Sequence, residues 1–313
     1  MSTKENIAIL IPCYNEALTI EKVIKDFNKI LPSATIYVFD NNSNDGTADI
    51  AINTEAEVIL SPLMGKGNVV QHMFRSVDAD IYVMVDGDNT YPASELPKML
   101  THFKNNDLDV LVGMRLKDYK KNAFRLLHKF GNRLISKIIS FLFKTKIQDA
   151  LSGYRIFSKY YVKNINLQSQ HFEIETEITI SSFLHGFKLE EIPIIYNERP
   201  KGSVSKLNTF GDGISIIKSI LIVMKAHRPG LIYYSLSFIT FVSGLVAGYY
   251  PIMDYYIHKF VYHVPLAILA ASLEILSTIL FTVGIILTHT SRLHRETRNI
   301  LNKMNKNIQD RQS

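Results

Sequence analysis

The first two thirds of the chain alternate between two hydrophobic periods. Short runs of β-branched and other apolar residues are separated by stretches in which apolar residues recur every three or four positions. The predicted strands are Ile7–Ile11, Thr35–Phe39, Val58–Leu60, Ile81–Val85 and Val110–Val112, with a further pair of strands at Gly153–Phe157 and Leu189–Tyr196. The predicted helices lie near residues 17–30, 45–53, 66–78 and 94–105. This alternation indicates an α/β fold with a mostly parallel sheet.

The last quarter of the chain contains two long apolar segments. Leu231–Met253 has no Asp, Glu, Lys or Arg, and Glu274 is the one formal charge in Val264–Thr288. Each segment exceeds the roughly 20 residues that a helix needs to cross about 30 Å of hydrocarbon. Buried core helices are the alternative, but they seldom remain uncharged for so long. We therefore predict a two-helix transmembrane hairpin with spans at about 231–253 and 264–288.

Basic residues flank the hairpin on both sides. Lys218, Lys225 and Arg228 precede the first span, and Arg292 and Arg295 follow the second. The positive-inside rule then places both termini and the N-terminal domain in the cytoplasm.

The sequence divides into four parts. The first is an α/β domain at residues 1–208, and the second is an amphipathic interfacial helix at 209–229, within which Phe210–Ala226 has helical periodicity. The hairpin at 230–289 and a basic cytoplasmic tail at 290–313 complete the chain.

Composition narrows the class of protein. A hydrophobic content of 47% excludes a disordered chain, and a single cysteine excludes a disulfide framework. The 35 Lys and Arg residues exceed the 29 Asp and Glu residues, which suits an anionic partner. The stretch Lys117–Lys146 is especially basic, with apolar residues at helical spacing. Beside two membrane spans, lipid headgroups and phosphates fit this stretch better than nucleic acid does.

Polar residues follow the predicted strands. In parallel sheets, ligands bind where the strands end, so Pro12–Glu16, Asp40–Asn42 and Asp86–Asp88 are candidate site segments. Two carboxylates at Asp86 and Asp88 suit Mg²⁺ or Mn²⁺, which usually keep coordination positions for substrate phosphates. The first segment lacks the glycine-rich signature of dinucleotide-binding and P-loop enzymes. The second segment suits a base and ribose, or forms an Asx turn with a helix cap.

Six motifs in this order resemble glycosyltransferase family 2, which has the GT-A fold. The first four are Pro12-x-Tyr14-Asn15-Glu16, Asp40-Asn41-Asn42-Ser43-x-Asp45-Gly46-Thr47, Gly65-Lys66-Gly67-Asn68 and Asp86-x-Asp88. The last two, which resemble the polyprenyl-phosphate group of that family, are Gln148-Asp149-x-x-Ser152-Gly153-Tyr154-Arg155 and Arg199-x-x-Gly202-Ser203-x-Ser205-Lys206-Leu207. Dolichol-phosphate mannose synthase belongs to this group, and the hairpin resembles the membrane anchor of its bacterial and archaeal members. The resemblance implies a Rossmann-like GT-A domain at 1–208.

The resemblance also implies roles for particular residues. The donor-binding residues would be Pro12, Tyr14, Asn15, Glu16, Val38, Asp40, Asn42, Lys66, Asp86, Gly87 and Arg115. The residues that bind the acceptor and its phosphate would be Arg125, Arg133, Ser152, Arg155, Arg199, Ser205 and Lys206. The metal ligands would be Asp86 and Asp88, and the catalytic residues Asp88 and Asp149.

Three further positions bear on these roles. The family often has Gln or His two residues beyond the second Asp, as an added metal or sugar contact, where this chain has Thr90. Acidic residues alternate at Glu173, Glu175 and Glu177, and the resemblance would make one of them a sugar-side contact. Asp149 stands where the family places a candidate base. A phosphate monoester, whose second pKa is about 6, is largely dianionic at neutral pH and needs no base. Asp149 would then orient the acceptor or stabilise charge on the sugar.

The resulting expectation is an inverting, metal-dependent glycosyltransferase. It would move a hexose from a UDP- or GDP-sugar to a polyprenyl phosphate on the cytoplasmic face, with Mg²⁺ or Mn²⁺, and form a homo-oligomer through its spans. One alternative is a hydroxyl acceptor in a glycolipid or polysaccharide, for which Asp149 would be a true base. The other alternative is a non-catalytic membrane scaffold that binds nucleotide sugars.

Overall fold

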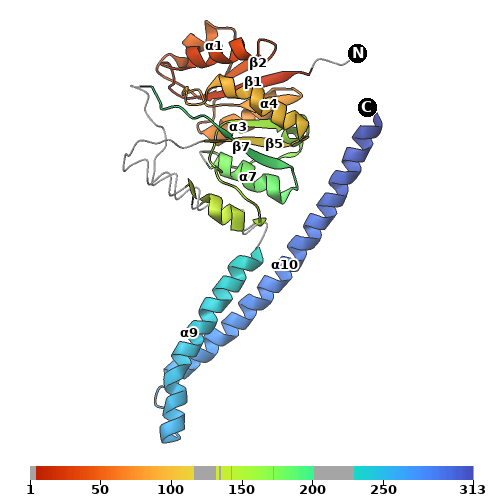
Figure 1. The fold of residues 1–313 in the computed structure, drawn as a ribbon. Coiled ribbons are helices and arrows are strands. Elements are labelled where there is room, and N and C mark those ends of the chain that lie inside the picture. The colour runs from red at the N-terminus through yellow and green to blue at the C-terminus, as the bar shows by residue number, and fades with distance from the viewer. Residues whose placement is uncertain are drawn as a thin grey trace. The chain divides into compact units, whose positions relative to one another are not determined.

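A computed structural model describes residues 5–115, 132–133, 135–141, 143–171, 173–200 and 229–312. The chain forms two compact units, Met1–Ser219 and Ile220–Ser313. The first unit contains the sheet with its helices, and the second contains two long helices (Figure 1). The predicted interfacial helix at Phe210–Ala226 lies outside the described residues.

A seven-stranded sheet forms the centre of the first unit, in the order β3-β2-β1-β4-β6-β5-β7. The strands are β1 (Ile7–Cys13), β2 (Thr35–Asp40), β3 (Glu57–Leu60), β4 (Ile81–Met84), β5 (Val110–Arg115), β6 (Arg155–Ser158) and β7 (Leu189–Ile194). All neighbouring strands are parallel except that β6 runs antiparallel to both β4 and β5. The prediction of a mostly parallel α/β sheet is confirmed.

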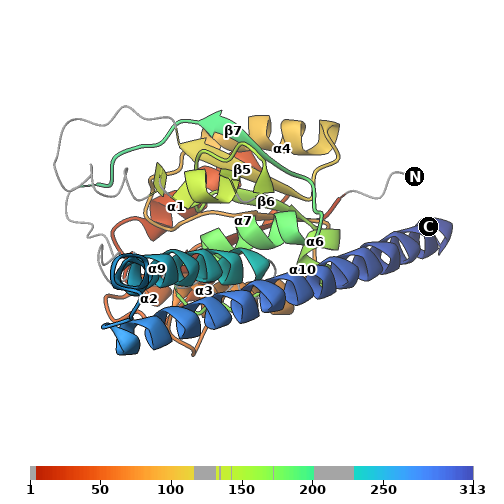
Figure 2. The same cartoon turned by 90° about the horizontal axis from the view of Figure 1, so that it is seen from below.

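Helices cover both faces of this sheet (Figure 2). One face carries α1 (Ile20–Ile30), α2 (Thr47–Ile52), α4 (Leu96–Asn105) and the short 3₁₀ turn η1 (Ala93–Glu95). The other face carries α3 (Lys66–Ser76), α6 (Lys159–Asn164) and α7 (Ile174–Leu184). Alternate residues of β1 enter the two hydrophobic layers, since Ile9 packs with α1 and Leu10 packs with α3. Burial on both faces explains why the strands appear as continuous apolar runs in the sequence.

The predicted strands Gly153–Phe157 and Leu189–Tyr196 exist as β6 and β7, but they do not pair with each other. Strand β5 lies between them, antiparallel to β6 and parallel to β7. Hydrophobic periodicity identifies a strand without identifying its neighbour, so this pairing depends on the tertiary fold.

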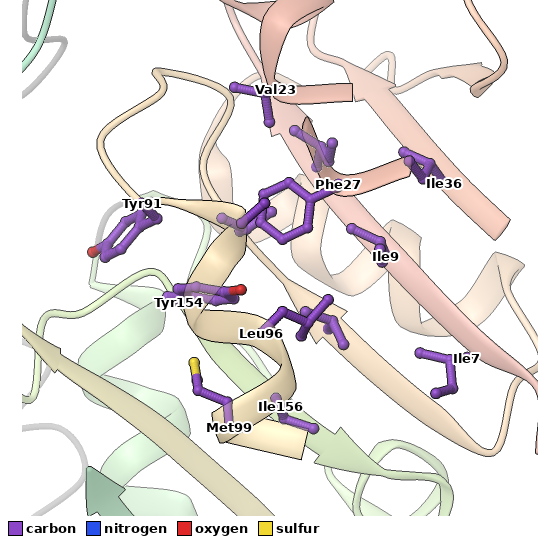
Figure 3. Packing of buried hydrophobic residues seen from close by; sticks show 14 of the residues in the cluster. Ile7, Ile9, Val23, Phe27, Ile36, Tyr91, Leu96, Met99, Tyr154 and Ile156 are labelled. Atoms are coloured by element: carbon purple, nitrogen blue, oxygen red, sulfur yellow. The ribbon is translucent and has the colours of Figure 1, made fainter. Parts of the chain in front are cut away.

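Aromatic residues connect the core to the loops at the carboxyl edge of the sheet. Tyr154, next to β6, packs edge-on against Phe27 of α1 and against Tyr91, with ring centroids 6.0 and 5.5 Å apart (Figure 3). Tyr91 continues the chain just beyond Asp88, and Tyr154 follows Gly153. Packing of these rings therefore holds two polar loops against the same hydrophobic layer.

The second unit is a hairpin of α9 (Pro229–His258) and α10 (Val264–Gln312), drawn in cyan and blue in Figure 1. Its segments Gly230–His258 and Val264–Leu293 are long and apolar enough to cross a membrane. Both segments run beyond the predicted spans. The first continues through the polar residues after Met253, and the second continues past Thr288 to Leu293. The predicted basic tail at 290–313 is not a separate element, since α10 continues through it to Gln312.

Small residues bring α9 and α10 together. The Ser237 and Ser277 hydroxyl groups each donate to the other residue's carbonyl, at 2.9 and 3.0 Å. A Cβ atom on Gly244 would lie 2.5 Å from the Glu274 carboxyl oxygen Oε1, and that oxygen is buried without a hydrogen-bond partner. Small residues at such a contact let the two helix backbones approach closely.

We predict that a Ser237→Cys/Ser277→Cys variant forms an intramolecular disulfide on mild oxidation. The two hydroxyl oxygens are 3.2 Å apart, so the side-chain atoms that sulfur would replace already lie next to each other. Mass spectrometry of the digested protein detects the linked peptides. The native Cys13 is buried and does not interfere. Ser243→Cys/Ser272→Cys, at two exposed positions of the same helices, is the matched control, and equal linkage of both pairs would contradict this packing.

Candidate functional site

Side chains of the β2–α2 loop hold the β1–α1 loop in place. The Asn15 backbone N–H donates to Ser43 Oγ at 2.9 Å, and the Glu16 N–H donates to Thr47 Oγ1 at 2.8 Å. Asn15 has a φ of 53°, a left-handed conformation that asparagine tolerates better than most residues. The motif residues after the two strands are therefore joined into one structural unit.

Asp40 ends β2 with one carboxylate oxygen unpaired. Its Oδ2 accepts the Ser43 N–H at 3.0 Å, while its Oδ1 is buried without a hydrogen-bond partner. The residue is only 2% exposed, so the unpaired oxygen is costly unless a ligand N–H reaches it. Val38, predicted to contact the donor, has a side chain that is fully buried in the hydrophobic core, so only its backbone could make that contact. Tyr14 is exposed beside this edge.

The acidic pair Asp86 and Asp88 follows β4, next to β1. Thr19 Oγ1 donates to the Gly87 carbonyl at 2.7 Å, which fixes the turn between the two carboxylates. A Cβ atom at Gly87 would lie 2.8 Å from Cys13 Sγ, and one at Gly153 would lie 2.4 Å from Asp86 Oδ2. Both glycines therefore permit backbone approaches that any side chain would block.

Lys66, at the start of α3, lies between two acidic groups. Its Nζ is 2.6 Å from Asp86 Oδ1 and 2.6 Å from Glu175 Oε1. Burial alone would lower the pKa of Lys66, but the two flanking carboxylates outweigh it and raise the pKa above its usual value. Of the three alternating acidic residues, Glu175 thus faces the site through Lys66. Glu177 instead accepts the backbone N–H groups of Gln168 and Ser169.

Asp88 is held at both carboxylate oxygens. Thr90 Oγ1 donates to Oδ1 at 2.5 Å, and an Arg199 guanidinium nitrogen lies 2.5 Å from Oδ2. Burial and the charge of Asp86 raise the pKa of Asp88, while Arg199 and Thr90 oppose the rise. Thr90 therefore orients Asp88, at the position where the family often has a Gln or His.

Asp149 is the centre of a second ion pair. Its Oδ2 accepts the Arg115 Nε–H at 2.8 Å and the Arg115 backbone N–H at 3.0 Å. Its Oδ1 accepts a second guanidinium N–H at 2.6 Å and the Asn132 amide at 2.9 Å. Burial would raise the pKa of Asp149, but Arg115 and Asn132 together hold it below its usual value. Glu191 on β7 accepts the Asp149 N–H and so fixes the loop.

Two predicted acceptor residues serve the fold instead. Arg155 is 0% exposed and donates to the carbonyls of Ala150 and Ser152 and to Thr179 Oγ1. Ser152 is also fully buried and donates to the Gly113 carbonyl at 2.6 Å. Neither side chain has a surface on which to meet a phosphate, so both assignments need correction. Arg155 holds the turn that carries Asp149.

Four predicted acceptor residues remain. Arg133 is exposed, and Arg125, Ser205 and Lys206 lie outside the described residues. The sequence prediction gave Glu175 only as one of three candidate sugar-side contacts, and it omitted Glu191, Asn132 and Tyr196 from the site. Tyr196, whose ring lies 5.4 Å from the Arg115 guanidinium carbon, stacks on that side chain. Glu175 had a signal in the alternating acidic row, whereas Asn132 had none.

The oxygen ligands available at the acidic pair suit a hard divalent cation that binds together with substrate phosphates. Asp86 and Asp88 provide carboxylate oxygens, the ligands that Mg²⁺ and Mn²⁺ prefer. Within the described parts of the chain, no group of three or more His, Cys, Asp and Glu side chains is placed to hold a metal ion. The protein would therefore supply few ligands, as is usual where substrate phosphates complete the coordination.

Together the fold and the site define a class of protein. The sheet has helices on both faces. At its carboxyl edge lie the unpaired carboxylate oxygen of Asp40, the acidic pair Asp86 and Asp88, and several basic side chains. This arrangement suits an enzyme that handles a nucleoside diphosphate.

Comparison with known proteins identifies the family. Residues 8–165 match the glycosyl transferase family 2, and the chain belongs to this family. Glycosyltransferase AglJ of Haloferax volcanii is 31% identical over 297 residues, which cover 95% of this chain and 97% of the relative. The dolichyl-phosphate hexose transferase of the same organism is 30% identical over 226 residues, or 72% of this chain and 97% of the relative. These relatives agree with the polyprenyl-phosphate glycosyltransferase group.

A solved structure shows the same fold. Glucosyl-3-phosphoglycerate synthase from Mycobacterium tuberculosis, solved with Mn²⁺, UDP and glucosyl-3-phosphoglycerate, matches with a TM-score of 0.58 at 17% identity. The match covers 70% of this chain and 80% of that protein. The first unit therefore has a GT-A fold, and membership of glycosyl transferase family 2 makes the chain a glycosyltransferase.

We predict that Asp149→Asn destabilises the protein by about 3 kcal/mol at neutral pH, because it leaves Arg115 without its anionic partner. Because the folded-state pKa of Asp149 is lowered, its stabilising effect is present above the unfolded-state pKa of about 3.9 and is lost as pH falls through the folded-state pKa. The difference between the two proteins should thus shrink below about pH 4. Denaturant unfolding across this range measures it. Asp107→Asn, on the surface, should change stability by less than about 0.5 kcal/mol.

We predict that Lys66→Met also costs about 3 kcal/mol, because it leaves Asp86 and Glu175 without their shared cation. Adding Glu175→Gln should recover part of this loss, since it removes the more buried of the two acidic charges. Thermal and denaturant unfolding of the single and double variants test the coupling. Purely additive effects would show that Lys66 and Glu175 do not stabilise each other.

Proposed function

We propose that this protein is an inverting glycosyltransferase that moves a hexose from a nucleoside diphosphate sugar to a polyprenyl phosphate at the membrane surface. The observation that carries the proposal is that both carboxylate oxygens of Asp149 already accept hydrogen bonds from Arg115 and Asn132. Four hydrogen bonds and a lowered pKa make this group a poor proton acceptor.

A hydroxyl acceptor would need a base to take its proton as it attacks the sugar. A phosphate monoester has a second pKa of about 6 and is mostly dianionic at neutral pH, so one of its oxygens can attack directly. Asp149 then acts as a positioning residue that holds the Arg115 guanidinium at the carboxyl end of β5. Its engagement therefore supports a phosphate acceptor.

The donor would lie across the carboxyl ends of the strands. The unpaired Oδ1 of Asp40 on β2 is suited to accept an N–H of the base. Asp86 and Asp88 follow β4, which lies two strands away, a separation of about 10 Å. That separation suits a nucleoside whose base is bound at β2 and whose diphosphate is bound beyond β4.

The reaction would proceed by displacement at the anomeric carbon. A bond forms between this carbon and an oxygen of the lipid phosphate, while the bond to the diphosphate breaks and its electrons stay on the leaving oxygen. Attack opposite the leaving group inverts the anomeric centre. Arg115, Lys66 and Arg199 would be the cations that stabilise the charge developing on the diphosphate. A divalent cation held by Asp86 and Asp88 would supply further charge stabilisation there.

The apolar hairpin supports a lipid as the acceptor. Its two helices suggest membrane anchoring, and an anchored enzyme meets the headgroup of its acceptor without extracting the chain from the bilayer. The flanking basic residues support a cytoplasmic active site. The name of the dolichyl-phosphate hexose transferase relative supports the same acceptor class.

We predict that nucleoside diphosphate release requires undecaprenyl phosphate. The full-length protein in nanodiscs is assayed with Mg²⁺ or Mn²⁺ and a panel of UDP- and GDP-sugars, with undecaprenyl phosphate or undecaprenol. Undecaprenyl phosphate should support release, and undecaprenol should not. Asp88→Asn should reduce the rate of release at least about 100-fold, because it disturbs stabilisation of the leaving diphosphate. Asp107→Asn should retain the rate. Release that is equally fast with undecaprenol would move the assignment to a hydroxyl acceptor.

A further inference from the structure

The two carboxylate oxygens of Asp88 have partners of different kinds. Oδ1 accepts both the Thr90 hydroxyl, at 2.5 Å, and the Thr90 backbone N–H, at 3.1 Å. Oδ2 lies 2.5 Å from a guanidinium nitrogen of Arg199. Asp88 itself is 3% exposed, so both oxygens lie in a largely enclosed position.

The Thr90 contacts belong to the local turn. They join residues two positions apart, and the Thr90 carbonyl in addition accepts the Asn197 N–H at 2.8 Å. Releasing Oδ1 would therefore disturb both the turn and its connection to the segment after β7. Oδ1 is the fixed oxygen of the pair.

The Arg199 contact is of a different type. It is made by the end of a long side chain that is 28% exposed and that crosses from the segment after β7. Rotation about side-chain bonds can withdraw the guanidinium without moving the backbone. Oδ2 is therefore the oxygen whose partner can be exchanged.

We propose that Arg199 is the counter-ion of Asp88 in the metal-free enzyme and competes with the divalent cation for Oδ2. This inference rests on the proposed function, which places a cation and a diphosphate at Asp88. It adds a role to Arg199, which would leave Asp88 and turn to the phosphates when the cation enters.

Electrostatic repulsion favours this exchange. A Mg²⁺ ion bound to Oδ2 would lie about 2.1 Å from it. With the guanidinium nitrogen still 2.5 Å from the same oxygen, the Mg²⁺ ion and that nitrogen would be at most about 4.6 Å apart, and their positive charges would repel. The incoming donor diphosphate offers an anionic partner to the displaced guanidinium. Cation binding is thereby weak without the donor and strong with it.

The test measures Mn²⁺ affinity of the full-length protein in detergent by electron paramagnetic resonance, without nucleotide. Arg199→Gln should bind Mn²⁺ about tenfold more tightly than the wild type, because one charge-assisted hydrogen bond no longer competes. Asp88→Asn should bind it at least about tenfold more weakly. Adding UDP should narrow the difference between Arg199→Gln and the wild type, since the diphosphate draws the arginine away in the wild type.

Arg115→Gln is the matched control. It removes the same charge from the same edge of the sheet, but Arg115 pairs with Asp149 rather than with Asp88. Equal tightening in both variants would reveal a general field effect and overturn the proposal. Mn²⁺ binding by Arg199→Gln that is unchanged, weaker or undetectable would also overturn it. The Mn²⁺-binding measurements need no lipid acceptor. They can therefore contradict the role of Arg199 while lipid-dependent turnover is observed, and they can support that role while such turnover is absent.

Discussion

Pairing of partly buried charges is the constraint on which the rest of the site depends. Four carboxylates, Asp86, Asp88, Asp149 and Glu175, gather at one edge of the sheet, and each lies against a cation. Lys66, Arg115 and Arg199 provide these cations, and an unpaired charge at the same depth would be strongly unfavourable. The basic side chains that would bind phosphates thus also stabilise the buried carboxylates in the folded protein.

The core determines how precisely these pairs can form. Tyr91 and Tyr154 pack together and hold the loops after β4 and before β6 against α1 and α4. Gly87 and Gly153 let those loops approach Cys13 and Asp86 more closely than any side chain would permit. The buried guanidinium of Arg155 completes the arrangement by holding the carbonyls of the turn that follows Asp149. The hydrophobic layer and the polar edge are therefore one structure.

The engagement of Asp149 connects this architecture to the choice of acceptor. A carboxylate that is held by Arg115 and Asn132 is suited to positioning and poorly suited to proton transfer. An acceptor that arrives already ionised makes no demand for a base. The apolar hairpin suits an acceptor of the same kind, a phosphate on a lipid chain. Two features that are independent in the sequence thus support one reaction class.

The sequence by itself determined the strands and most helices of the first unit, the apolar hairpin and the order of the motifs. These depend on local periodicity and spacing, which a single chain displays directly. The tertiary structure decided the neighbours of β6 and β7, the burial of Val38, Ser152 and Arg155, and the contact between Arg199 and Asp88. These features join residues far apart in the chain, and a motif identifies a residue type without showing which face it occupies or which charge it meets. The pairing of Arg115 with Asp149, across 34 positions, belongs to this second group because only the folded sheet brings the two together.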